Sequence, residues 1–157
     1  MTTPNSQQLY RALEILWRCY TQAPMSYCEE RPDSAMRVGL RWFSCAAAGA
    51  DNRAILLGID PELASTLTRD MFGGEHSQIT GAQVLDAIGE MANIIAGSVN
   101  TLEGLEVGLQ VPIKLEDDQV MRCFSDLELL AEVLIESDGL PCYLAITDGD
   151  LGVGGEH

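Results

Sequence analysis

The segment from Thr80 to about Thr101 most restricts how this chain can fold, because it predicts one long helix with a single apolar side. Successive side chains on an α-helix are rotated by about 100°. On that rotation large apolar residues lie within about 60° of one line along the helix: Val84, Ile88, Met91, Ile95, Val99 and Leu102. This side faces a core, so the helix lies against the rest of the domain.

The helix has a clear start and an unusual interior. Thr80 and Gln83 have the T-x-x-Q spacing of a capping box, in which each side chain satisfies a backbone N–H of the other residue. Gly89 and Gly97 lie further along, and each glycine costs an exposed helix interior about 1 kcal/mol relative to alanine. Two such residues need a structural or functional reason.

The side of this helix opposite the apolar stripe is polar, includes glycine and has no basic residue. A band from roughly 160° to 240° around the helix includes Asp86, Glu90, Asn93, Gly97 and Asn100. Solvated helix faces usually favour Lys, Glu, Arg and Gln. The band is therefore either a surface on which another molecule lands or a face packed under a neighbouring element of the same domain, with glycines for clearance.

The first half of the chain predicts two further helices and a hairpin. Apolar residues recur at helical spacing over 7–22, and a second helix begins at the N-cap Asp60 with Pro61 in first position and stops at Gly73. Between them, residues 35–47 and 53–59 predict two strands of a hairpin. The first strand places Val38, Leu40 and Trp42 on one side.

The second half predicts strands. Residues 107–115 alternate between apolar and polar, although Pro112 indicates an edge strand or a bulge. Further strands are expected at 120–124, 130–136 and 140–147, with the turn residues of a hairpin between the last two. Residues 126–136 fit a helix equally well by period.

Composition limits the organisation and the partners. A chain of 157 residues that is 46% hydrophobic fits a single domain over 1–157, with a helix and turn at about 1–34 and a flexible tail at 148–157. The net charge of −15 comes from 24 acidic and 9 basic residues, of which Lys114 is the only lysine. A phosphate backbone would be repelled, so neither nucleic acid nor an anionic membrane is an expected partner.

The chain has few candidates for a metal site of its own. The five cysteines include no C-x-x-C pair, and the two histidines, His76 and His157, lie in a glycine-rich turn and at the terminus. We therefore expect no metal and reduced thiols. The N-terminus lacks a charged start followed by an apolar run, and no stretch approaches 18 apolar residues, so we expect neither a signal peptide nor a membrane span, and a cytoplasmic location.

The run VLDAIGEMANIIAG resembles the signature helix of the CheC, CheX and FliY chemotaxis phosphatases, whose active motif E-x-x-N is matched by Glu90 and Asn93. No other glutamate has an asparagine three residues later, and a single copy resembles the CheX branch. The order of elements from about 37 to 147 is similar too. The resemblance implies an α+β, CheC-like single domain: a sheet of mainly antiparallel strands with helices packed on it and the signature helix exposed on one face.

The resemblance also implies a function. The substrate would be the aspartyl phosphate of a CheY-like response-regulator receiver domain, which carries its own Mg²⁺, so the phosphatase itself needs no cofactor. Asn93 would orient the attacking water and Glu90 would pair with the regulator's lysine, while Asp86, Gly89, Gly97 and Asn100 would contact the partner. A noncatalytic module that docks on a receiver domain or a flagellar switch component is the alternative, and a purely structural subunit is a third possibility.

One departure from the family concerns the partner. CheX-like proteins commonly continue the motif with GNAK, whereas this chain has Gly97, Ser98, Val99 and Asn100. The Glu90–Asn93 pair is intact, but the regulator could belong to chemotaxis or to another two-component system. CheX-like proteins also form homodimers through sheet strands, and residues 107–115 could supply such an edge or be a buried strand of the monomer.

Overall fold

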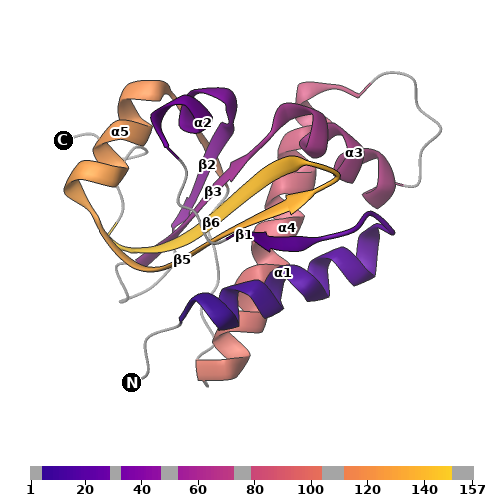
Figure 1. The fold of residues 1–157 in the computed structure, drawn as a ribbon, viewed down its shortest axis with the longest axis horizontal. Coiled ribbons are helices and arrows are strands. Elements are labelled where there is room, and N and C mark those ends of the chain that lie inside the picture. The colour runs from indigo at the N-terminus through magenta and orange to yellow at the C-terminus, as the bar shows by residue number, and fades with distance from the viewer. Residues whose placement is uncertain (1–4, 29–32, 47–52, 73–78, 104–111, 150–157) are drawn as a thin grey trace.

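Six antiparallel strands form one sheet in the order β1-β5-β6-β3-β2-β4, with helices on both faces (Figure 1). The computed structural model describes residues 5–28, 33–46, 53–72, 79–103 and 112–149. The strands are β1 (Ser26–Cys28), β2 (Arg41–Ala46), β3 (Arg53–Ile59), β4 (Ile113–Leu115), β5 (Glu128–Ser137) and β6 (Leu140–Asp148). The helices are α1 (Ser6–Tyr20), α2 (Ser34–Gly39), α3 (Pro61–Met71), α4 (Gly81–Glu103) and α5 (Asp117–Asp126). The predicted α+β class is confirmed.

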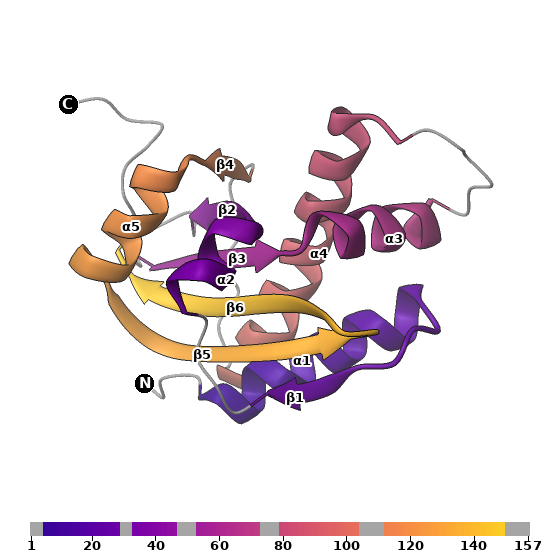
Figure 2. The same cartoon turned by 45° about the horizontal axis from the view of Figure 1, so that its top comes forward.

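The two faces of the sheet bury separate apolar cores. Side chains alternate along each strand, so Phe43 and Cys45 of β2 join one core while Trp42 joins the other. The larger core lies under α1, α3 and α4, and the smaller one lies under α2 and α5. Figures 1 and 2 show these two groups of helices on opposite sides of the sheet.

Local capping signals located two helix starts correctly, those of α3 and α4. Asp60 accepts hydrogen bonds from the backbone N–H groups of Glu62 and Leu63 at 2.8 and 3.2 Å, with Pro61 in the first turn. Thr80 and Gln83 exchange the two bonds of the predicted capping box at 3.0 and 3.2 Å. The helix predicted from apolar spacing over 7–22 is α1, and it follows a capping box at Asn5 that was not predicted.

The predicted hairpin of the last two strands is also confirmed. Asp138 and Gly139 have φ angles of 53° and 79° between β5 and β6. Two successive residues with positive φ match the twist of the flanking strands, which is why Asp-Gly favours this turn. The helical alternative for residues 126–136 is wrong, because β5 pairs with β6 on one side and with β1 on the other.

The strand predicted over 35–47 begins too early. Residues 34–39 form α2, and Val38 is 73% exposed instead of sharing a strand face with Trp42. The Asp33 carboxylate accepts the Met36 N–H at 2.8 Å and so caps this short helix. The Trp42 indole N–H also donates to the Arg37 carbonyl at 2.8 Å, which ties the helix to the strand that follows it.

The strand predicted over 120–124 is wrong, because these residues belong to α5. Val120 and Cys123, three residues apart, are the buried side chains of this helix. The Glu116 N–H donates to the Gln119 side chain at 2.8 Å in a capping box that the sequence analysis overlooked. The residues 120–124 therefore lie in a short amphipathic helix and not in the predicted strand.

The sheet edges were predicted only in part. Of the strand expected over 107–115, the described residues contain Ile113–Leu115, which form β4 at an edge of the sheet, as Pro112 indicated. Residues 104–111 lie outside the described ranges, so dimerisation through this segment stays a prediction. The other edge, β1, was not predicted, since three residues carry too little pattern.

A substitution at Gly58 can test how tightly the smaller core is packed. A Cβ atom added there would lie 2.6–2.8 Å from three ring atoms of the buried Trp42. Since Phe124 and Tyr143 enclose that ring, with centroids 5.5 and 5.6 Å away, we expect Gly58→Ala to lower the free energy of unfolding by about 1–3 kcal/mol. Urea denaturation measures this. Gly39→Ala, with nothing within 4 Å of its added Cβ, is the control, and equal loss in both variants would contradict the prediction.

Candidate functional site

Asp86, Glu90 and Asn93 form an exposed strip along α4, which we call the open face. On the opposite side of the helix Ile88, Met91 and Ile95 are buried in the larger core. The prediction that Glu90 and Asn93 share an exposed helical face above a buried stripe is therefore confirmed. Their roles in a reaction stay predictions.

The chemistry available on the open face follows from helix spacing. Side chains three residues apart, such as Glu90 and Asn93, are neighbours, with about 5–6 Å between Cβ atoms. The carboxylate can only accept hydrogen bonds and attract a cation, whereas the carboxamide both donates and accepts. Together they can hold a charged partner and orient a small polar molecule, such as water, beside it.

Gly89 borders the open face and lies against the protein's own chain. A Cβ added to this glycine would lie 3.5 and 3.6 Å from Cγ and Cδ of Pro112, the residue before β4. These are ordinary van der Waals distances, so the fold does not require glycine here. Sequence reasoning treated Pro112 only as a strand breaker and missed it as a border of the site.

Gly89→Ala is therefore expected to stabilise the isolated protein by about 1 kcal/mol, because alanine is the better helix former and its methyl group has room. The midpoint of urea denaturation should rise without a change in slope. A lower midpoint would mean that the contact with Pro112 is tighter than it appears.

The remaining predicted partner-binding residues lie near the end of α4. The helix continues through Gly97 and Asn100 to Glu103. The surroundings of these two residues fall outside what the structure describes, so their contact role stays a prediction.

The three buried cysteines, Cys45, Cys123 and Cys142, offer no activated nucleophile at neutral pH. Burial raises the pKa of the Cys45 and Cys142 thiols to about 12 and that of Cys123 to about 11. A thiol attacks as the thiolate, so these three side chains remain protonated packing groups. Cys19, Cys45, Cys123 and Cys142 are free thiols.

The described part of the chain contains no group of three or more His, Cys, Asp and Glu side chains that could hold a metal ion. In the same residues, no helix has the length and hydropathy needed to cross a membrane.

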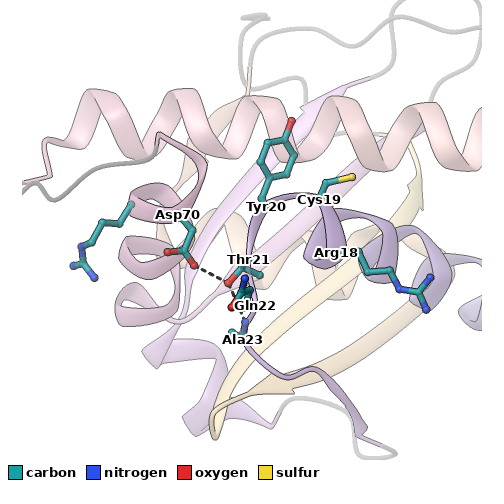
Figure 3. A pocket seen from close by; sticks show the side chains of 8 residues that line it. Arg18, Cys19, Tyr20, Thr21, Gln22, Ala23 and Asp70 are labelled. Atoms are coloured by element: carbon teal, nitrogen blue, oxygen red, sulfur yellow. Dashed lines mark hydrogen bonds between the residues drawn. The ribbon is translucent and has the colours of Figure 1, made fainter.

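A polar hollow of about 580 Å³ lies between the C-terminal ends of α1 and α3 (Figure 3). Its centre is occupied by a hydrogen bond of 2.6 Å from the Thr21 hydroxyl to the Asp70 carboxylate. Arg18 points away from Asp70 in this view. The lining residues come from 18–23 and 69–70, so the hollow includes no residue of the open face.

Comparison with known proteins places α4 in context. A family model described as "Chemotaxis phosphatase CheX" matches residues 46–130, more than half of the chain and including the whole open face. Among curated proteins, none matches this sequence.

Solved structures show a similar fold. A chain in the CheX–CheY–BeF₃–Mg²⁺ complex from Borrelia burgdorferi aligns with a TM-score of 0.67 at 15% identity, covering 95% of this chain and 100% of that one. The chemotaxis protein CheX from Vibrio vulnificus aligns with a TM-score of 0.63 at 14% identity, covering 90% and 93%. FliY from Thermotoga maritima aligns with a TM-score of 0.51 at 18% identity, covering 90% and 84%.

Proposed function

The chain belongs to the CheX family of chemotaxis phosphatases, and on that basis we propose that it hydrolyses the aspartyl phosphate of a CheY-like receiver domain. One observation carries the proposal: Glu90 and Asn93, which match the family's E-x-x-N motif, lie exposed one turn apart on α4. A similarly folded relative from Borrelia burgdorferi is described in a complex with CheY, BeF₃ and Mg²⁺, which supports a partner of this class.

Asn93 is the proposed catalytic residue. Hydrolysis requires a water oxygen to attack phosphorus in line with the bond to the aspartyl oxygen. That bond then breaks, releasing the partner's carboxylate and inorganic phosphate, and the proton of the water leaves with phosphate or solvent. A carboxamide cannot remove the proton, but it can hold the water through its oxygen and N–H groups. Positioning of this kind is the main contribution of proteins to phosphoryl transfer.

Glu90 is the proposed docking residue. Its exposed carboxylate lies one turn from Asn93 and can form a charge-assisted hydrogen bond with a lysine of the receiver domain. That bond would hold the partner in one register, with its phosphoryl group above Asn93. The partner's Mg²⁺ would stabilise the charge on the phosphoryl oxygens, so this chain needs no metal of its own.

Phosphate release from a phosphorylated, Mg²⁺-loaded CheY-like receiver domain tests the proposal. We expect the protein to shorten the lifetime of the phosphorylated form in a concentration-dependent way. If the protein binds the receiver domain activated with beryllofluoride but leaves its phosphorylated lifetime unchanged, the noncatalytic docking module is correct instead. If it neither binds CheY-like receiver domains nor hydrolyses their aspartyl phosphate, the proposed function is wrong.

A further inference from the structure

Lys114 lies on the same face of the sheet as α4. In the pairing of β2 with β4, Lys114 is opposite Phe43, and Leu115 is opposite Trp42. Opposed residues in an antiparallel pair point to the same side. Phe43 belongs to the core under α4, whereas Trp42 and Leu115 belong to the core on the other face. The exposed Lys114 therefore extends from the sheet edge on the side of α4.

This edge is in contact with α4 beside the open face. Pro112, two residues before Lys114, lies against Gly89. Two residues of extended chain span about 7 Å. Lys114 is thus attached next to the Gly89 flank of the helix, and its four-carbon stem is long and flexible.

The position of Lys114 means that the two flanks of the open face differ in charge. By helix rotation, Asn93 lies between Gly89 and Glu90, about 40° from the first and about 60° from the second. Carboxylate charge is therefore on one flank of Asn93, and the strand edge that carries Lys114 borders the other. In a chain with a net charge of −15, this cation is the only lysine, and none of the described residues forms an ion pair with it.

We propose that Lys114 binds an anionic group on the receiver domain and so fixes the orientation of that domain over Asn93. The inference rests on the proposed function and extends it. A receiver domain that presents a lysine to Glu90 and an anion to Lys114 fits in one orientation, whereas the reversed orientation places like charges together. Charge complementarity of this kind contributes mainly to specificity and association rate.

A structural explanation competes with this proposal. Lysine on an edge strand discourages the edge from pairing with another chain. In that case Lys114 would control self-association and would have no effect on the receiver domain. The two explanations predict different outcomes for the same variants.

The experiment compares Lys114→Met, Lys114→Glu and Lys114→Arg with Arg122→Met and Arg122→Glu. Arg122 is an exposed cation on α5, on the opposite face of the sheet, so it controls for the change in net charge. The probe is a CheY-like receiver domain, phosphorylated for turnover and loaded with beryllofluoride and Mg²⁺ for binding. Stopped-flow association at low and high salt, steady-state turnover and sedimentation velocity are measured for every variant.

We expect Lys114→Met to lower kcat/KM about threefold and Lys114→Glu about tenfold, mainly through KM and the association rate. The losses should shrink in high salt, and Lys114→Arg should stay within about twofold of wild type. Equal effects of the Lys114 and Arg122 variants would overturn the proposal. A change in self-association alone would overturn it in favour of edge protection. If the wild-type protein neither binds the receiver domain nor dephosphorylates it, the proposed function itself is wrong.

If the loss appears equally with the unactivated receiver domain, the anion is a carboxylate of its surface. If it appears only with the activated domain, the anion is the phosphoryl group or its beryllofluoride substitute. Either result supports an anion-binding role for Lys114 and identifies the group.

Discussion

Asn93→Ala should lower the protein's stimulation of receiver dephosphorylation by about 100-fold, since misplacing an attacking water costs a factor of this order. Alanine is the better helix former, and Asn93 is exposed, so the fold should be retained. Single-turnover phosphate release from the phosphorylated receiver domain measures the loss, which should appear in kcat.

Binding provides the control for this variant. Affinity for the beryllofluoride-loaded receiver domain should stay within about threefold of wild type, because a water-orienting group contributes little to docking. Asn93→Asp keeps the shape of the side chain but replaces the carboxamide N–H donors with charge, and it should also lose activity. Full activity of Asn93→Ala would mean that the site has been misassigned, even if the protein is a phosphatase.

Glu90→Ala should weaken binding of the receiver domain as well as turnover. Removing one partner of a desolvated charge pair at a protein interface costs about 2–5 kcal/mol, which corresponds to a loss of affinity of roughly 30-fold or more. Titration calorimetry with the beryllofluoride-loaded domain measures this loss. Glu90→Gln keeps the length of the side chain and removes the charge, so it separates the ion pair from simple contact.

Glu136→Ala is the matched control for lost charge, because Glu136 is exposed on β5, away from the open face. It should bind and turn over like wild type. If Glu90→Ala retains wild-type affinity while losing turnover, Glu90 acts in the chemical step and not in docking. If it loses neither, Glu90 has no role in docking or turnover.

The candidate site could be predicted because it lies on one helix. The angle between Glu90, Asn93 and the buried Ile88 depends only on the helical rotation, which is the same in every protein. The capping boxes and the Asp138–Gly139 turn are local as well, since their bonds join residues a few positions apart. These features could therefore be predicted from the sequence alone.

The errors arose in short elements. Residues 34–39 and 120–124 each have too few apolar positions for the helical and strand periods to be told apart. The tertiary structure resolves them, because the Arg37 guanidinium lies 4.2 Å from the centre of the Phe124 ring and so joins α2 to α5 over the smaller core. A contact between residues so far apart in the chain leaves no periodic signal.

The sequence alone determined that an apolar stripe from Val84 to Ile95 must be buried and that Glu90 and Asn93 lie opposite it, since helix geometry requires both. Only the tertiary structure decided what lies beside them. The strand order brings β4 to the edge next to β2, and this places Pro112 against Gly89 and turns Lys114 toward the side of α4. Strand pairing joins distant segments and sets which face each side chain takes, and a shift of one residue in register would have turned Lys114 to the opposite face.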